Sequence, residues 1–251
     1  MSVLKHEGTH PILFETASVP VRTVTHTAYR AMPDLRGEWP TVMVIGGDKG
    51  LSSPIRDLCR RLARHGFAAL APDLYAGASV PDDPEERALK FANLEPAGTK
   101  RILRDVGRYL ADGLGPWDTD DEGFGIIAAQ AGARLGVETA IEFGSPLVLA
   151  APNLSEISPG LDDEFKPLPA PPGVLDSLPQ LVEPLLGLIG RDDEVSPIGD
   201  VMAARESAPH SQWVIYDGLG HDFLDDNEAG FDLPAFNDAF ERIIDFCSKN
   251  L

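Results

Sequence analysis

The sequence predicts an α/β fold: a mostly parallel, doubly wound sheet with helices on both faces and an antiparallel hairpin at its N-terminal edge. Short, wholly apolar runs alternate nearly throughout with longer segments whose apolar residues recur at helical spacing. Strands joined by helices run parallel, because the right-handed crossover returns the chain to the same edge of the sheet. In residues 11–30 apolar and polar side chains alternate instead, which predicts a short edge hairpin before the main sheet.

The first half of the chain then supplies two buried strands and their helices. We expect a strand at 40–47 and a helix that begins near Pro54, because proline suits the first turn of a helix, and ends at Gly66. A second buried strand follows at 67–75. The acidic segment 83–112 carries an apolar stripe that predicts one long helix or two consecutive ones.

The second half continues the alternation. The expected elements are, in order, a strand at 126–128 that turns abruptly into a helix, a strand at 140–152, a strand at 184–190, a helix at 197–209, a strand at 212–218 and a helix at 233–248. A Pro-rich, acidic loop of about 152–178 is either a flap over the site or a surface excursion, and we favour the excursion. Since α/β folds of this size are commonly single domains, we expect 1–251 to form one.

Composition excludes several classes of partner. The formal charge is −19, from 40 acidic and 21 basic residues, and such a surface repels the phosphates of a nucleic acid. No apolar run approaches the ~20 residues that cross a bilayer, so we expect no membrane partner. The first 15 residues hold no basic segment followed by an apolar block, which indicates a cytoplasmic protein without a signal peptide. Oligomeric state is left open.

Cofactor, metal and disulfide signatures are also missing. No G-x-G-x-x-G follows a strand and no P-loop is present, so we expect a small-molecule substrate and no cofactor. The acidic run 222–228 has no histidine or cysteine at ligand spacing beyond the adjacent His221, and is interpreted as a solvated loop without metal. Cys59 and Cys247 share faces with apolar side chains at helical spacing, which favours core packing over a disulfide or a nucleophile.

The segment 123–136, GFGIIAAQAGARLG, has the shape of a nucleophile turn. A short apolar strand breaks at small residues, among them Ala128 and Gly132, and a helix follows at once, as in the strand-turn-helix that raises a nucleophile in α/β-hydrolases. The residue at the apex is Gln130. Its amide can donate and accept hydrogen bonds but cannot attack a carbonyl as a thiolate or alkoxide does.

An acid and a histidine follow where a catalytic triad needs them. Asp193 comes just after a buried strand, and His221 lies in a Gly-flanked loop after the next one. Nucleophile position, acid and histidine thus follow the order of α/β-hydrolases, in which the acid fixes one imidazole nitrogen and leaves the other as a base. Each residue also has a plainer interpretation: a solvated loop histidine, and a helix cap at Asp193 with Asp192 as an equally good carboxylate.

These segments together resemble the dienelactone hydrolase family. The resemblance covers roughly 20–248 and is carried by VMVIGGDKGLSSPIRDLCRRLARHGFAALAPDLY, the turn at Gln130, G-x-x-D and G-x-G-H. It implies the α/β-hydrolase fold and hydrolysis of small cyclic enol esters by a Cys-His-Asp triad with a backbone oxyanion hole. Asp193 and His221 would then be the acid and base, and the amide of Ala131 would face the oxyanion.

The chain departs from the family pattern within the site. Gln130 stands where the family has cysteine, and Gly46 and Gly47 replace its His-Glu pair, with Asp48 the nearest carboxylate. The family's two substrate-binding arginines correspond to Gly77, two residues after Tyr75 of the PDLY motif, and to Asp225. From this comparison we expect Gly47, Asp48, Ala131, Tyr75 and Gly77 to contact substrate, and an anionic dienelactone is a poor match.

Three hypotheses follow. In the first, His221 and Asp193 form a general base without covalent catalysis, Gln130 orients substrate or water, and a small uncharged carbonyl compound is hydrolysed or undergoes a lyase, isomerase or cyclase reaction. In the second, the protein is a non-catalytic pseudoenzyme that binds a small molecule. In the third, an ordinary hydrolase uses a displaced nucleophile, for which Ser145 is the candidate. We favour the first, and the second is the main alternative.

Overall fold

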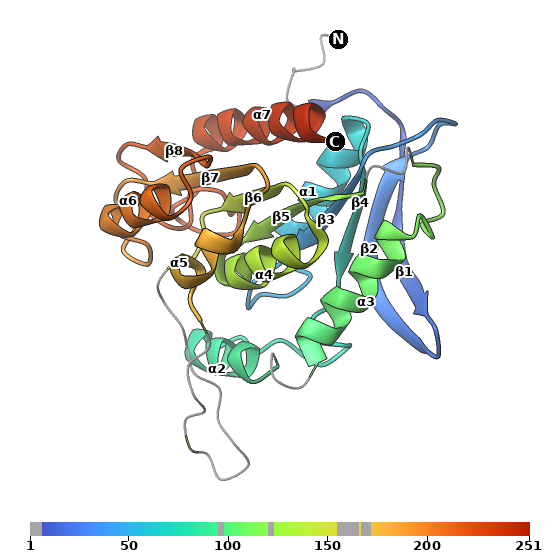
Figure 1. Cartoon of the computed structure of the whole chain (residues 1–251), viewed down its shortest axis with the longest axis horizontal. Helices are drawn as coiled ribbons and strands as arrows, with labels where there is room; N and C mark the ends of the chain where they lie inside the picture. The colour runs from blue at the N-terminus through green and yellow to red at the C-terminus, as the bar shows by residue number, and fades with distance from the viewer. Residues whose placement is uncertain (1–6, 95–97, 120–122, 155–165, 167–171) are drawn as a thin grey trace.

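The computed structural model describes residues 7–94, 98–119, 123–154, 166 and 172–251. Its centre is one eight-stranded sheet of order β1-β2-β4-β3-β5-β6-β7-β8 (Figure 1). The strands are β1 (Ile12–Val21), β2 (Val24–Pro33), β3 (Thr41–Ile45), β4 (Ala68–Pro72), β5 (Gly125–Ala129), β6 (Leu147–Ala150), β7 (Leu185–Gly190) and β8 (Gln212–Tyr216). All neighbours from β4 to β8 pair in parallel, so the predicted fold class is confirmed.

The N-terminal hairpin is longer and better integrated than expected. Its strands have ten residues each, and a tight turn with Arg22 at a φ of 54° joins them. Residues 28–31 of β2 pair antiparallel with β4, so the hairpin extends the main sheet at one edge. The predicted antiparallel hairpin at the edge of the sheet is therefore confirmed, and only its strands are longer than expected, because β2 pairs with the open edge of β4.

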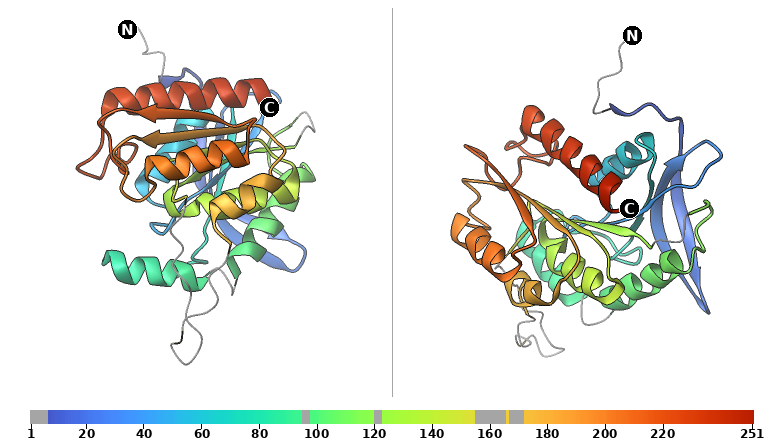
Figure 2. Two further views of the ribbon diagram at one scale, coloured as in Figure 1. Left: turned by 60° about the vertical axis from the view of Figure 1, so that its left-hand side comes forward. Right: turned by 45° about the horizontal axis from the view of Figure 1, so that its top comes forward.

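Helices cover both faces of the sheet. They are α1 (Ser53–Arg64), α2 (Pro84–Leu94), α3 (Lys100–Ala111), α4 (Ala133–Phe143), α5 (Val174–Ser177), α6 (Ile198–Ser207) and α7 (Leu233–Asn250). Helices α1 and α7 lie on one face, and α3, α4 and α6 lie on the other (Figure 2). Strand β3 packs against both: Val42 and Val44 join the core under α1 and α7, and Met43 and Ile45 join the opposite core.

Two expected elements need correction. The strand expected at 140–152 covers only Leu147–Ala150, because α4 continues to Phe143 and Gly144 ends it in the left-handed conformation, at a φ of 64°. Most of the loop expected at 152–178 lies outside the described residues, and its last part forms α5. Among the described residues, no helix is both long and apolar enough to span a bilayer.

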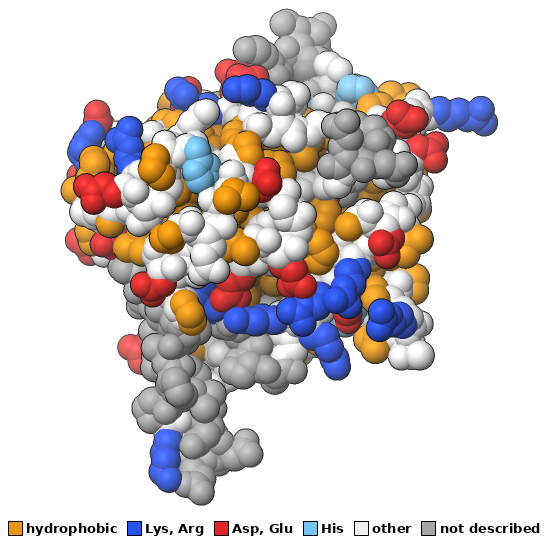
Figure 3. All heavy atoms as spheres, in the orientation of Figure 1, with side chains coloured by type: hydrophobic (Ala, Val, Ile, Leu, Met, Phe, Trp, Pro, Cys, Tyr) orange, Lys and Arg blue, Asp and Glu red, His pale blue; other side chains and the backbone are white. Residues whose placement is uncertain are grey.

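The surface around α3 and α4 carries acidic and basic side chains side by side (Figure 3). Ion pairs between the two helices join Lys100 to Glu138, at 3.0 Å, and Arg104 to Glu142, at 2.6 Å. Both pairs are open to solvent, which screens them, so they contribute little to stability. The fold is held instead by the two apolar layers on either side of the sheet.

Both cysteines are expected to be unreactive in the native protein. Burial in the core raises the pKa of the Cys59 and Cys247 thiols to about 12, so almost no thiolate forms at pH 8. We expect Ellman's reagent at pH 8 to label neither cysteine in the native protein and both after unfolding in urea. Because the unfolded thiols ionise near pH 9 and the folded ones do not, stability should also fall as pH rises above 9. Rapid labelling of native protein would contradict this burial.

Candidate active site

Gln130 occupies a strained turn at the end of β5. Its φ of 48° lies in the left-handed region, which residues with long side chains rarely adopt, and a single 3-10 turn, Gln130–Gly132, leads into α4. The turn is tightly packed from behind: a Cβ on Gly132 would lie 2.5 Å from the carbonyl oxygen of Gly46. The small residues that predicted a nucleophile turn are therefore required by the geometry of this site.

Asp193 and His221 form a hydrogen-bonded pair. His221 Nδ1 lies 2.8 Å from Asp193 Oδ2, and the two residues come from the loops after β7 and β8. The other oxygen, Oδ1, accepts hydrogen bonds from the backbone N–H groups of Val195, at 2.8 Å, and Ser196, at 2.9 Å. Asp193 is only 3% exposed, whereas Asp192 is exposed, so Asp193 both caps its loop and holds the imidazole. With Nδ1 directed at a carboxylate, Nε2 is the nitrogen placed to act as a base.

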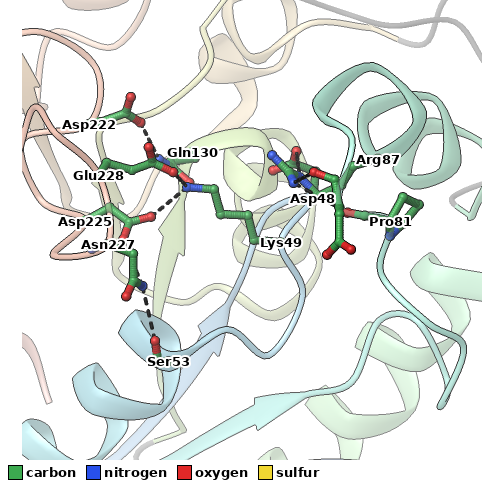
Figure 4. Close-up of polar contacts among 11 residues, drawn as sticks. Asp48, Lys49, Ser53, Pro81, Arg87, Gln130, Asp222, Asp225, Asn227 and Glu228 are labelled. Carbon is green, nitrogen blue, oxygen red and sulfur yellow. Dashed lines mark hydrogen bonds and ion pairs between the residues drawn. The ribbon is translucent and has the colours of Figure 1, made fainter.

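Gln130 and His221 line the same cavity, and an acidic neighbour holds the glutamine amide. Gln130 Nε2 donates to Asp222 Oδ1 at 3.3 Å, a contact visible in Figure 4. The backbone carbonyl of Gln130 accepts a hydrogen bond from the N–H of Asn153 at 3.2 Å. The sequence did not point to Asp222, because its neighbourhood resembled a solvated acidic loop.

The backbones of Gly47 and Ala131 approach each other closely. A Cβ on Gly47 would lie 3.1 Å from the backbone nitrogen of Ala131 and 3.3 Å from the carbonyl oxygen of Ala129. Glycine at position 47 therefore allows the loop after β3 to lie against the turn that carries Gln130. The expected oxyanion donor, the amide of Ala131, therefore lies beside the loop that carries Gly47.

Asp48, Tyr75 and Gly77, which are also predicted to contact substrate, make hydrogen bonds within neighbouring loops. Asp48 Oδ2 accepts from Arg87 Nε at 3.0 Å, and the hydroxyl of the buried Tyr75 donates to the carbonyl of Asp48 at 2.5 Å. The N–H of Gly77 donates to Asp73 at 2.8 Å. Burial, and then the negative charge of Asp48, raises the pKa of Tyr75. Within the described part of the chain, none of the three lines the cavity shared by Gln130 and His221, and their contact with substrate stays a prediction.

The cavity beside Gln130 and His221 encloses about 110 Å³ and runs between α1 and α7. Most of its wall is apolar. The large apolar side chains in this wall are Ile55, Leu58, Leu224, Phe231, Leu233, Phe236, Phe240 and Ile243. Phe236, Phe240 and Ile243 share the helical face of Cys247, and this spacing alone indicates core packing. Helical spacing identified the correct face of α7, but it could not show that one end of this face borders a cavity.

Lys49 bridges the two loops at the mouth of this cavity. Its Nζ donates to Asp225 Oδ2 at 2.7 Å and to Glu228 Oε1 at 2.6 Å, so the loop after β3 is tied to the loop after His221 (Figure 4). Partial burial by itself lowers the pKa of Lys49, but the hydrogen bonds from the two carboxylates outweigh it and hold the pKa above its ordinary value of 10.5. The loop after His221 also contacts the start of α1, where Asn227 Nδ2 donates to Ser53 Oγ at 3.1 Å.

Replacing Lys49 by methionine is expected to lower the free energy of unfolding by about 1–3 kcal/mol, because the buried Asp225 carboxylate loses its charged partner. Urea unfolding followed by circular dichroism measures the change. Arg191→Met is the matched control, since the Arg191–Asp217 pair is exposed to solvent and its loss should lower the free energy of unfolding much less. Equal losses in the two variants would mean that the Lys49 bridge contributes no more than a surface pair.

Ser145 lies away from this site. It precedes β6 and is buried at the amino ends of the parallel strands, whereas Gln130, Asp193 and His221 follow the carboxyl ends of β5, β7 and β8. Ser145 is therefore not placed to act as a displaced nucleophile with Asp193 and His221, because β6 begins later than the sequence indicated and α4 extends almost to it.

The comparisons with known proteins agree with this architecture. The model of the dienelactone hydrolase family matches residues 26–251. A protein of Methylorubrum extorquens named "Putative carboxymethylenebutenolidase" is 27% identical over 242 residues, which cover 91% of this chain and 78% of the relative. A "Probable 2-oxo-3-(5-oxofuran-2-ylidene)propanoate lactonase" of Bradyrhizobium is 26% identical over 228 residues, 86% of each chain. A crystal structure titled as a putative dienelactone hydrolase from Klebsiella pneumoniae superposes with a TM-score of 0.81 at 24% identity and covers 95% of this chain and 99% of that one.

The fold and the paired acid and histidine at the carboxyl edge of the sheet are those of an α/β-hydrolase-type protein. Since the family model spans nearly the whole sequence, the chain belongs to the dienelactone hydrolase family.

Proposed function

We propose that this protein is an enzyme that acts on a small uncharged carbonyl compound, a lactone, ester or polyketide-like molecule, through a His221–Asp193 general base and without a covalent Cys or Ser nucleophile. The observation that carries the proposal is the 2.8 Å hydrogen bond between His221 and the buried Asp193, beside a cavity that Gln130 also lines. In this proposal Gln130 stands at the position of the family's cysteine.

In the hydrolytic form of the reaction, His221 Nε2 removes a proton from water as the water oxygen bonds to the carbonyl carbon. Asp193 stabilises the imidazolium that forms. The negative charge moves to the carbonyl oxygen, which would lie near the backbones of Gly47 and Ala131. When the intermediate collapses, the leaving alkoxide takes the proton back from His221. A lyase, isomerase or cyclase reaction would begin instead with removal of a proton from the carbon beside the carbonyl.

Charge around the cavity supports an uncharged substrate. Lys49, the cation nearest the mouth, already faces the carboxylates of Asp225 and Glu228. Asp225 and Gly77 occupy the positions at which the family resemblance places substrate-binding arginines. An additional anion would therefore approach carboxylates, and the described cations that line the cavity, Lys49 and Arg61, are already paired. The lactonase activity named for the Bradyrhizobium relative is consistent with a lactone as the reacting group.

The alternative is a non-catalytic protein of the same fold that binds a small molecule. Gln130 favours it, because an amide cannot form an acyl-enzyme. The test is to incubate the purified protein with a panel of neutral lactones and aryl esters and to quantify both product and ligand-induced shifts in melting temperature. Product formation above the spontaneous rate supports the enzyme, whereas stabilisation by a ligand that is recovered unchanged supports the binding protein.

A further inference from the structure

We infer that the cavity between α1 and α7 is a subsite for a compact apolar group of the substrate, such as a phenyl ring or an alkyl chain of about four to six carbons. The inference rests on the proposed function, since it assigns the part of the substrate that lies away from the reacting carbonyl. It adds the identity of that part and the side chains that select its size.

The walls of the cavity are built for an apolar occupant. Phe236 and Phe240 stand one helical turn apart on α7, with ring planes inclined by only 7° and centroids 6.4 Å apart, and Phe231 lies 5.6 Å from Phe236. Ile55 and Leu58 of α1 line the cavity as well. Aromatic and aliphatic surfaces of this kind gain free energy when they exclude water with an apolar group between them.

Both cations that line the cavity are already paired with carboxylates. Arg61 Nε donates to Asp57 Oδ2 at 2.6 Å, and its guanidinium lies 5.0 Å from the centroid of the Phe236 ring. Lys49 is held in the same manner by Asp225 and Glu228. Among the described residues that line the cavity, an anionic group would lose hydration and meet no cation that is not already paired, so the subsite selects against anions.

Alanines connect the cavity to the reacting residues and set its depth. Ala129, Ala150 and Ala151 line it where β5 and β6 end, next to Gln130. On the opposite side Ala239, which is 1% exposed, lines it between Phe236 and Phe240. Larger side chains at these positions would occupy the space, so a substrate can have its carbonyl at His221 and its apolar group between the helices.

The volume limits the size of the group. A cavity of about 150 Å³ in an apolar protein interior accommodates benzene. The 110 Å³ here therefore suits one ring or a short chain, with slight movement of Leu224 or Phe231, which are partly exposed. Each buried methylene should raise affinity about 4-fold until the space is filled.

The test is a series of γ-lactones, from γ-butyrolactone to γ-dodecalactone, in which only the length of the alkyl side chain changes, from none to eight carbons. Binding is measured by saturation-transfer NMR and calorimetry, and hydrolysis by titration of the acid formed. We expect affinity to rise about 4-fold per methylene and to level off at a side chain of four to six carbons. Affinity that does not depend on chain length would overturn the subsite.

Two substitutions should shift the alkyl-chain length that binds best, in opposite directions. Ala239→Leu narrows the cavity and should weaken binding of γ-octalactone by at least about 10-fold, the equivalent of nearly two methylenes, while γ-butyrolactone is unaffected. Leu58→Ala enlarges the cavity and should shift the optimum to longer chains. Ala111→Leu on the exposed end of α3 is the control and should change neither the affinity for γ-octalactone nor the chain length that binds best. Equal effects of Ala239→Leu on all lactones would also overturn the subsite.

The two measurements separate this inference from the proposed function. Chain-length-dependent binding without product would keep the apolar subsite and overturn catalysis. If product forms at the same rate whatever the alkyl chain of the lactone, the proposed catalysis stands and the subsite is overturned.

Discussion

Replacing His221 by alanine is expected to lower kcat for a neutral lactone by about 100-fold to 10,000-fold, the usual contribution of a general base. The imidazole is held by Asp193 at 2.8 Å beside the cavity, and no other side chain takes over its Nε2 position in the proposed mechanism. Asp193→Asn should cause a loss of similar order, because an amide can stabilise the wrong tautomer and cannot stabilise an imidazolium. Steady-state rates of acid release measure both.

His210→Ala is the matched control. His210 is exposed at the end of the helix-to-strand connection before β8, at the opposite edge of the sheet from the site, so its removal should leave kcat unchanged. Urea unfolding of the three variants shows whether any loss of activity is a loss of folded protein. Full activity in folded His221→Ala would exclude the general-base mechanism.

Replacing Gln130 by cysteine is expected to create a burst of product with aryl esters, up to about one equivalent per active site, where the wild type shows none. A thiol on a turn with a φ near 48° would project into the cavity that His221 lines, and the imidazole could take its proton. The thiolate would attack the carbonyl carbon and release the phenolate, and the acyl group would remain on sulfur. Stopped-flow detection of nitrophenolate measures the amplitude of the burst.

Two variants check the origin of that burst. Gln130→Ala should show no burst, because it offers no nucleophile. The double variant Gln130→Cys with His221→Ala should lose most of the burst, because the thiol loses the base that activates it. If folded Gln130→Cys shows no burst while its thiol reacts freely with iodoacetamide, the pairing of position 130 with His221 is wrong.

Patterns in the sequence were enough to predict the fold class and the edge of the sheet at which the site forms. Alternating apolar runs and helical periodicity required parallel strands, and parallel strands bring their carboxyl ends to one edge. Residues that directly follow β5, β7 and β8 therefore had to approach one another, and Gln130, Asp193 and His221 do so. The small residues around Gln130 indicated the strained turn for the same local reason, since only they allow the backbone to pass so closely.

At two places the local sequence pattern fits more than one structure, and the tertiary environment decides between them. Ala140 and Ile141 suit a strand or a helix, and they belong to α4 because Ala140 is buried in the core with the rest of the apolar face and the helix ends only at Gly144. Asp192 and Asp193 were equivalent in sequence, and they differ only because one carboxylate is buried beside His221 and two backbone N–H groups. Such choices depend on contacts between residues far apart in the chain.

The cavity and its charged mouth were decided by tertiary structure alone. Lys49 meets Asp225 and Glu228 across about 180 residues of sequence, and no periodicity links them. Phe236 and Phe240 had the spacing of core residues, yet whether a core face is filled or left hollow depends on the side chains that the opposing helix presents. Periodicity predicts which face is apolar, because it follows from the geometry of one helix. A cavity is the space that two elements fail to fill together, so only their packing decides it.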